Sequence, residues 1–257
     1  MTAQRTSDTG SASVTAGIYV YGIVRAEVPV PDDLPTVGGT DLRLVRSGPL
    51  AALVSEVDLD RPLGLRDDLL AHEGVLDAVA ADSTVLPLRF GGVVQDLAAV
   101  RNELLAGNQD DFESILAELD GLVEFTLHGS YLDQIHLREI VGDDPEIRGL
   151  REELQGVPED SGHAARVRLG ELVSAAVERK RELTVGAAVA ALSPHSAATS
   201  VREVSGQDDA LSVALLVDRD RIEDFQRAVD ELGEDFAGRV RLRLLGPLAP
   251  YDFLPED

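Results

Sequence analysis

Apolar and polar positions in the first half of the chain switch between the two-residue period of strands and the longer period of helices. Residues 18–24 are β-branched and aromatic, which is typical of a buried strand. Residues 42–57 predict a hairpin that turns at Ser47, Gly48 and Pro49. Residues 65–81 repeat apolar side chains at helical spacing. Further strands are expected at 83–90 and 121–131, and short helices at 95–106 and 109–119.

This order of elements, β-β-β-α-β-α-β, mixes strands with helices and uses hairpins rather than strict crossovers. Such a pattern favours an α+β fold over a parallel α/β sheet. We therefore predict an N-terminal domain at 17–133 with the layered arrangement of a ferredoxin-like sandwich.

The second half has a different pattern, dominated by one long helix. Apolar residues recur every three or four positions over 164–192, and Ser193-Pro194 ends the period. A hairpin at 196–217, an amphipathic helix at 218–232 and a strand at 239–245 follow. These elements predict a C-terminal α+β domain at 134–257, with a terminal segment at 246–257.

Charge and composition exclude several classes of protein. Of the 257 residues, 47 are acidic and 23 are basic, so the net charge of -24 disfavours nucleic acid and anionic membranes as partners. The chain has no Cys, which excludes disulfides and thiol catalysis. No apolar run of about 18 residues occurs, so no membrane span is predicted. Residues 1–16 are small and polar and are expected to form a disordered tail.

Catalytic and cofactor motifs are missing from the sequence. It contains no phosphate-binding G-x-x-x-x-G-K-[ST], no dinucleotide G-x-G-x-x-G and no G-x-S-x-G elbow. His72-Glu73 begins a zinc-type H-E-x-x-H, but Leu76 stands where the second His is required. His128 and His136 are expected on the surface. We therefore predict no enzyme, no cofactor and no metal.

Two segments are unusual for their apolar character. Pro87 interrupts an apolar run, which indicates an edge strand or a bulge, and we favour a buried ion pair over a binding contact for Arg89. The terminal segment is too apolar and too stiff for a free tail, so Tyr251 and Phe253 are expected to dock on the body of the protein. The basic run 179–181 lies between two glutamates and predicts a salt-bridged helix face.

Four segments together resemble one family, the gas vesicle proteins GvpF and GvpL. In chain order they read VYGIV, HEGVLDAV, VLPLRFGG and GPLAPYDF, and the resemblance covers about residues 18–253. Gly92 replaces the usual Thr, while Leu248 and Ala249 replace the usual Trp-Pro. The matching positions, which are motif or contact residues, are Tyr21, Gly22, His72, Glu73, Leu86, Pro87, Arg89, Phe90, Gly91, Gly246, Pro247, Pro250, Tyr251 and Phe253.

The resemblance implies a gas vesicle accessory or assembly protein and a minor structural component, located at the gas vesicle in the cytoplasm. It implies binding to the hydrophobic shell protein GvpA, and other accessory proteins as partners. The long helix would supply the contact if Leu169, Leu172 and Leu183 are uncovered; otherwise this stripe packs on the sheet of its own domain. The alternative is a ferredoxin-like ligand-binding or regulatory module without catalysis, which a small-molecule pocket lined by His72, Arg89 and an acidic residue would favour.

Overall fold

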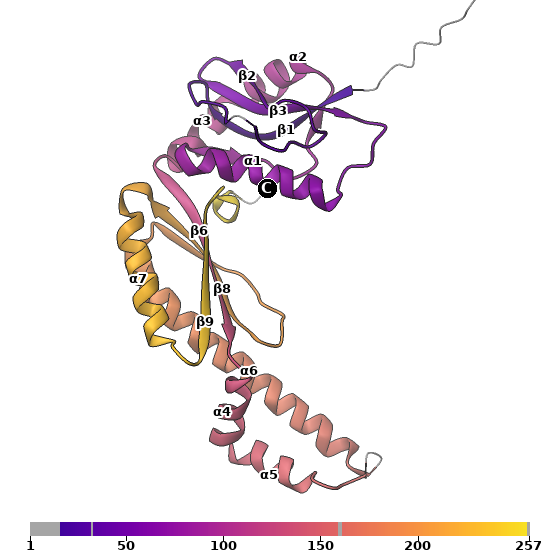
Figure 1. The fold of residues 1–257 in the computed structure, drawn as a ribbon, viewed down its shortest axis with the longest axis vertical. Helices are drawn as coiled ribbons and strands as arrows, with labels where there is room; N and C mark the ends of the chain where they lie inside the picture. Colours follow the sequence, from indigo (N-terminus) through magenta and orange to yellow (C-terminus); the bar gives the residue numbers. More distant parts are fainter. Residues whose placement is uncertain (1–15, 32, 159–160, 256–257) are drawn as a thin grey trace, which may run out of the picture. The chain divides into compact units, whose positions relative to one another are not determined.

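A computed structural model describes residues 16–31, 33–158 and 161–255 (Figure 1). The chain divides into two compact units, and the division falls between Leu119 and Asp120. The predicted tail lies outside the described residues except for Ala16, which begins the first strand. Both units combine an antiparallel sheet with helices, so the predicted α+β class is confirmed.

Unit 1 is built around an antiparallel sheet whose strands run in the order β2-β3-β1-β4, with β5 also paired to β1. Its strands are β1 (Ala16–Arg25), β2 (Arg43–Ser47), β3 (Leu50–Asp58), β4 (Val85–Pro87) and β5 (Val93–Val94). Its helical segments are α1 (Arg66–Asp82), α2 (Leu97–Ala99), the π-helical η1 (Val100–Leu105), η2 (Ala106–Asn108) and α3 (Gln109–Glu118). β1 is buried from residue 18 to residue 24, as its β-branched and aromatic composition predicts.

Unit 2 has a second antiparallel sheet with the order β7-β8-β6-β9. Its strands are β6 (Leu122–Tyr131), β7 (Ala198–Val201), β8 (Asp209–Asp218) and β9 (Val240–Leu248). Its helices are α4 (Ile135–Asp143), α5 (Pro145–Glu153), α6 (His163–Leu192) and α7 (Ile222–Asp235), with short turns η4 (Ser193–His195), η5 (Arg219–Arg221) and η6 (Tyr251–Phe253). The predicted long helix is therefore present, within one residue of its expected limits.

The last strand predicted for the N-terminal domain belongs to unit 2. This strand, β6, pairs with β8 on one side and β9 on the other, so the boundary predicted after residue 133 differs from the observed division. Val123, Phe125 and Leu127 project into the core of unit 2. The alternation along the chain identifies a strand, but it does not identify the strand's neighbours.

The connection between β1 and β2 in unit 1 contains no described helix, whereas a ferredoxin-like sandwich has one there. In unit 2, helices lie between β6 and β7 and between β8 and β9. The β-α-β-β-α-β order of a ferredoxin-like sandwich, the fold predicted for the N-terminal domain, therefore occurs in unit 2.

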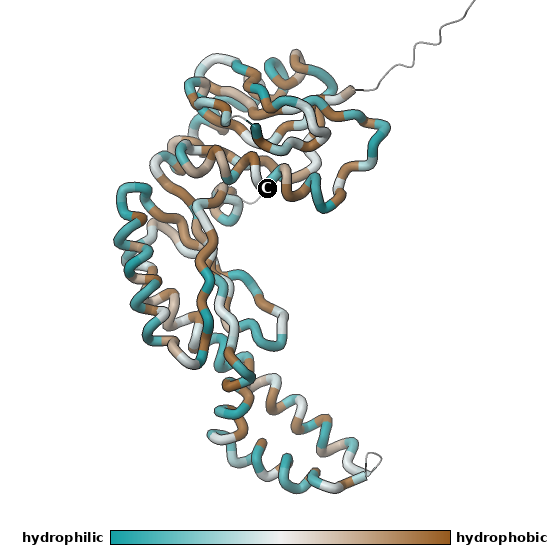
Figure 2. Tube along the Cα trace, viewed as in Figure 1, coloured by the Kyte–Doolittle hydropathy of each residue, from teal (hydrophilic) through white to brown (hydrophobic). Residues whose placement is uncertain are grey.

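The core of unit 2 lies between its sheet and two helices. Leu192 at the end of α6 and Phe225 on α7 pack onto the sheet, and the rings of Phe125 and Phe225 are 5.2 Å apart. Figure 2 shows hydrophilic positions along much of α7, because only one stripe of this helix faces the core.

The first half of α6 packs on helices instead of on the sheet. Leu169 and Leu172 contact a small core formed with Ile140 of α4 and Ile147 of α5. Leu183, further along α6, remains 75% exposed. The stripe predicted as a contact surface is thus covered at its first two leucines and open at the third.

Candidate functional site

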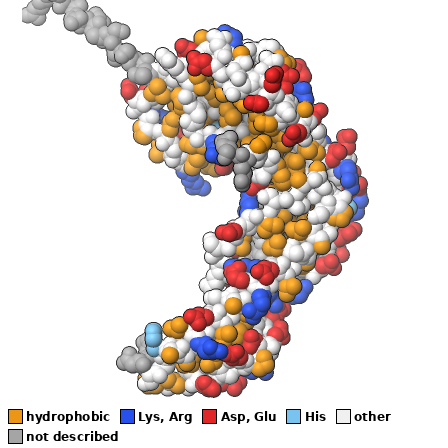
Figure 3. Space-filling view, turned by 180° about the vertical axis from the view of Figure 1, so that it is seen from behind, with side chains coloured by type: hydrophobic (Ala, Val, Ile, Leu, Met, Phe, Trp, Pro, Cys, Tyr) orange, Lys and Arg blue, Asp and Glu red, His pale blue; other side chains and the backbone are white. Residues whose placement is uncertain are grey.

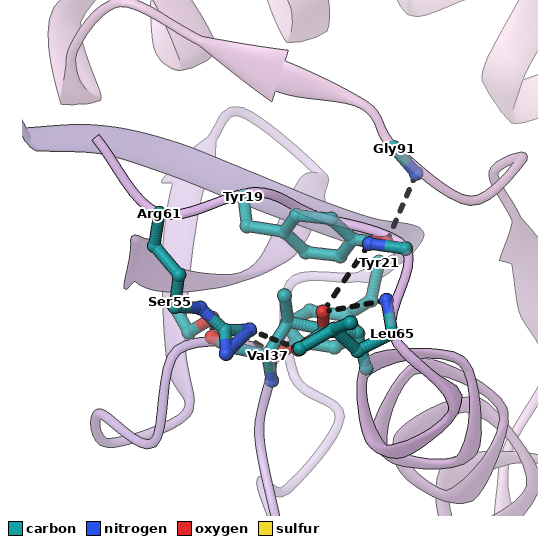
Figure 4. A network of polar contacts seen from close by, with 9 residues as sticks. Tyr19, Tyr21, Val37, Ser55, Arg61, Leu65 and Gly91 are labelled. Atoms are coloured by element: carbon teal, nitrogen blue, oxygen red, sulfur yellow. Dashed lines mark hydrogen bonds and ion pairs between the residues drawn. The ribbon is translucent and has the colours of Figure 1, made fainter. Parts of the chain in front are cut away.

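Unit 1 contains a buried polar cluster, which we call the tyrosine–histidine network: Tyr19, Tyr21, Ser55 and His72. Figure 4 shows Tyr19, Tyr21 and Ser55 of this network. β1 supplies both tyrosines, β3 supplies the serine and α1 supplies the histidine. The two tyrosine rings meet edge to face at 4.9 Å, and Tyr21 stacks on the imidazole at 5.7 Å. Sequence reasoning identified Tyr21 and His72 but gave no role to Tyr19 or Ser55.

His72 is held as a neutral imidazole by two hydrogen bonds. Its Nε2 lies 3.1 Å from the carbonyl oxygen of Leu88, which can only accept, so Nε2 carries the hydrogen. Its Nδ1 then accepts from the hydroxyl of Tyr19 at 3.0 Å, and that hydroxyl accepts from the N–H of Gly91 at 3.1 Å. Burial lowers the pKa of His72, while the Leu88 carbonyl partly opposes this shift. Burial also raises the pKa of Tyr19 to about 12.

Tyr21 and Ser55 fasten the helix-free connection to the sheet. The N–H of Val37 donates to the Tyr21 hydroxyl at 2.8 Å, this hydroxyl donates to Ser55 Oγ at 2.9 Å, and Ser55 Oγ donates to the Val37 carbonyl at 3.0 Å. Every polar atom in this closed ring is satisfied although the residues are buried. The ring therefore holds a loop in place and leaves no group free for chemistry.

Replacing Tyr21 with phenylalanine should lower the free energy of unfolding by about 1–3 kcal/mol, because the buried N–H of Val37 loses its acceptor. Denaturant unfolding measures this change. Ser55→Ala should destabilise similarly, and the double variant should lose less than the sum, since both changes open the same ring. Strict additivity would contradict the ring.

Asp68 completes the buried polar structure of unit 1 at the start of α1. Its carboxylate accepts hydrogen bonds from the backbone N–H groups of Gly64 and Leu65, each at 3.2 Å, and pairs with Arg61. It therefore supplies the N-terminal cap of a helix whose cap position, Leu65, has no polar side chain.

The remaining unit 1 motif residues divide into packed and exposed groups. A Cβ on Gly22 would lie 2.7 Å from the Leu86 carbonyl oxygen, so this glycine permits the close approach of β4. Pro87 lies in β4, at the edge of the sheet as its position in the sequence predicts. Phe90 is half-buried, with its ring 5.5 Å from that of His72.

Glu73 and Arg89 are both exposed, and neither forms an ion pair or a hydrogen bond with another described residue. The buried ion pair favoured for Arg89 is therefore wrong. The turn after β4 directs its guanidinium to solvent, where it is free to contact a partner.

Unit 2 contains a second polar cluster, which we call the carboxyl–arginine cluster: the buried Glu124 with the half-buried Arg202 and Asp252. Glu124 lies on β6 with 1% of its surface exposed, on the face opposite the helices. Its Oε1 is 3.2 Å from Arg202 Nη2, and its Oε2 accepts the N–H of Asp252 at 3.1 Å. Arg202 also pairs with the carboxylate of Asp252.

Two carboxyl groups in this cluster share one guanidinium, and their pKa values move apart. Burial, first, and the neighbouring Asp252 carboxylate together raise the pKa of Glu124 to about 8, while Arg202 opposes the shift. Arg202 lowers the pKa of Asp252. The cluster therefore holds one proton near neutral pH, on Glu124.

Sequence reasoning missed this cluster. Glu124 alternates with apolar residues, as solvent-facing residues of a strand do, and Asp252 is 128 positions away. The nearest signal was the terminal motif, whose Tyr251 and Phe253 flank Asp252. Both rings are half-buried, and Asp252 makes polar contacts with Glu124 and Arg202.

The helical part of unit 2 confirms the predicted salt-bridged run. Lys180 pairs with Glu139, and Arg181 pairs with Glu178 at 2.7 Å. His136 was expected on the surface, but it is fully buried and stacks on Tyr131 at 4.3 Å. α4 turns this side chain inward, a result of packing that spacing alone does not reveal.

Neither cluster assembles a reaction centre from the residues that the structure describes. Within residues 16–31, 33–158 and 161–255, no group of three or more His, Asp or Glu side chains could hold a metal ion. Over the same residues, no helix is long and apolar enough to cross a membrane. The tyrosine–histidine network attaches the β1–β2 connection to the sheet of unit 1, and the carboxyl–arginine cluster attaches η6 to the sheet of unit 2.

Comparison with known proteins identifies this architecture. The family model for the gas vesicle synthesis protein GvpL/GvpF matches residues 17–255, and the chain belongs to this family. It is 34% identical over 241 residues to gas vesicle protein F of Streptomyces sp. (strain CB03234), covering 92% of this chain and 98% of the relative. It is 32% identical over 259 residues to gas vesicle protein L of the same strain, covering 91% of each.

Two solved structures share the fold. GvpF from Microcystis aeruginosa aligns with a TM-score of 0.73 at 23% identity, covering 92% of this chain and 98% of that one. GvpF from Anabaena sp. PCC7120 aligns with a TM-score of 0.79 at 22% identity, covering 94% and 99%. Both similarities extend over the two units, and membership in the family implies a role in gas vesicle formation.

Proposed function

We propose that this protein is a non-catalytic accessory factor of the gas vesicle that binds the hydrophobic shell protein GvpA during assembly. Its membership in the GvpL/GvpF family supports the process. The net charge of -24 supports a carrier role, since mutual repulsion opposes aggregation while an apolar client is bound. The same charge disfavours nucleic acid as a partner.

One observation supports a particular contact surface, the α1 leucine patch: Leu65, Leu69 and Leu70. Their exposed fractions are 56%, 41% and 53%, although the opposite side of α1 is buried. The charged residues Arg66, Asp67 and Glu73 lie beside them on the same helix and are exposed. Exposed apolar side chains grouped among charged ones are found on protein-binding surfaces.

The space-filling view shows hydrophobic side chains interspersed with acidic and basic ones over the face that it presents (Figure 3). Single exposed apolar residues are normal on proteins, so grouping matters more than number. The patch groups three leucines within six positions of one helix, whereas the stripe predicted on α6 leaves only Leu183 open.

The alternative of a ligand-binding module lacks the pocket that would favour it. His72 is 2% exposed, and both of its ring nitrogens are engaged in hydrogen bonds. Arg89 is exposed at the surface. Both sheets have the strand order of a ferredoxin-like sandwich, although the described residues between β1 and β2 of unit 1 form no helix.

Co-expression with the shell protein tests the proposal. The wild-type protein should capture the shell protein and retain it in about 0.5 M salt, because an apolar contact is little screened. A variant with Leu65, Leu69 and Leu70 changed to serine should lose at least about tenfold in capture, equivalent to about 1.4 kcal/mol.

The matched control changes Val167 and Leu183 on α6, which are also exposed, to serine. This control should capture the shell protein as the wild type does. No capture at any salt, with both proteins folded, would refute shell binding. Equal losses in the two variants would remove α1 as the contact surface.

A further inference from the structure

The C-terminal segment, residues 249–255, is fastened to the sheet of unit 2 through a charged side chain. Ala249 and Pro250 are buried, and η6 lies against β7. The backbone N–H of Asp252 donates to the carboxyl group of Glu124. The carboxylate of Asp252 accepts a hydrogen bond from Arg202 Nε at 2.8 Å. These contacts hold η6 against the sheet.

The charges around Glu124 are few, so its protonation state controls their balance. Its cross-strand partners on β8 and β9 are Leu216 and Leu248, which are uncharged. Arg202, just after β7, and Asp252, in η6, are the charged groups that act on it. With Glu124 protonated, one carboxylate faces one guanidinium; with Glu124 ionised, two carboxylates share that guanidinium.

We propose that Glu124, Arg202 and Asp252 form a proton-controlled latch, which holds residues 249–255 on the sheet while Glu124 is protonated and releases them when Glu124 ionises. Glu124 belongs to the central strand β6 and Arg202 follows directly after the edge strand β7, whereas Asp252 lies in the short turn η6, outside the sheet. Withdrawal of Asp252 is therefore the movement that relieves the repulsion at the smallest structural cost.

Release also admits water to a carboxylate that is otherwise 1% exposed, and hydration favours the ionised form. Since burial and Asp252 raise the pKa of Glu124 to about 8 while the segment is in place, and release removes both causes, the transition lies at or below about pH 8. The latch acts within unit 2 and does not depend on the proposed binding of the shell protein.

The absence of cysteine allows a clean measurement of this movement. Pro255→Cys places a unique thiol at the exposed end of the segment for a nitroxide spin label. The mobility of the label, read by electron paramagnetic resonance, should rise as the pH increases from about 5 to about 9.5, with a midpoint at or below about 8. Far-ultraviolet circular dichroism should stay constant over this range, so that the signal reports the segment and not unfolding.

Two variants locate the transition. Glu124→Gln cannot ionise, and its label should remain immobile throughout; Asp252→Asn removes the second carboxylate, and its mobility should no longer depend on pH. Glu203→Gln, beside Arg202 but exposed, is the matched control and should keep the transition. A parent protein with equal label mobility at both pH extremes, or a persistent transition in both Glu124→Gln and Asp252→Asn, would overturn the latch.

Discussion

Replacing Gly246 with alanine should lower the free energy of unfolding by about 2–4 kcal/mol. The added Cβ would lie 2.5 Å from Cδ1 of Phe125 and 3.0 Å from the carbonyl oxygen of Glu124. Phe125 cannot move aside easily, because its ring packs on Phe225 in the core of unit 2. Gly246 also has a φ of 137°, which residues with a side chain rarely adopt.

Chemical denaturation of the two proteins measures the effect, and Gly233→Ala is the matched control. Gly233 lies in α7, where a Cβ meets no atom within 4 Å. This control should gain about 0.5–1 kcal/mol from helix propensity. Equal stabilities of Gly246→Ala and the wild type would mean that β9 does not approach Phe125 as described.

Replacing Glu124 with glutamine should raise the stability at pH 7 by up to about 3 kcal/mol. The pKa of Glu124 is raised from 4.5 to about 8 in the folded protein, so its favourable contribution is complete below pH 4.5 and is lost as the pH rises through 8. At pH 7 Glu124 keeps its proton in the folded wild type, whereas the unfolded chain releases it. Each unit of pKa difference between the two states lowers the free energy of unfolding by about 1.4 kcal/mol. The side-chain amide of glutamine can still donate a hydrogen bond to the Asp252 carboxylate, and it has no ionised form to be penalised by burial.

Unfolding measured from about pH 5 to about pH 8 should show a falling stability in the wild type and a flatter profile in Glu124→Gln. Asp252 changes the stability in the opposite direction, because its pKa is lowered in the folded protein. The stability that it contributes is lost only when the pH falls below the ordinary pKa of an aspartate, which lies outside this window. Glu203→Gln measures the general effect of removing one negative charge. Parallel profiles for Glu124→Gln and the wild type would contradict a buried, protonated carboxyl.

The periodicity of the sequence was sufficient for most individual elements. β1, the hairpin of β2 and β3, α1 and the long α6 all lie close to the positions predicted from apolar spacing. Their signals are local, because a strand or a helix buries one side at fixed intervals of two or of three to four residues. The four family motifs were equally visible, and the match over residues 17–255 confirms them.

The partners of these elements were decided only in the folded structure. β6 alternates clearly, yet its sequence does not tell which sheet it joins, and it was assigned to the wrong half. His136 and Glu124 carry polar side chains at positions typical of exposed residues, but packing buries both.

The sequence does not reveal these partners because the groups that interact are far apart along the chain. The sequence by itself determined where strands and helices form, the absence of thiol chemistry, the strong negative charge and the motif glycine at 246. Only the tertiary structure brought Asp252 to Glu124 and Tyr19 to His72, and thereby set their hydrogen bonds and pKa values. Local propensity acts between near neighbours, whereas burial and charge pairing depend on distant segments that meet only when the chain folds.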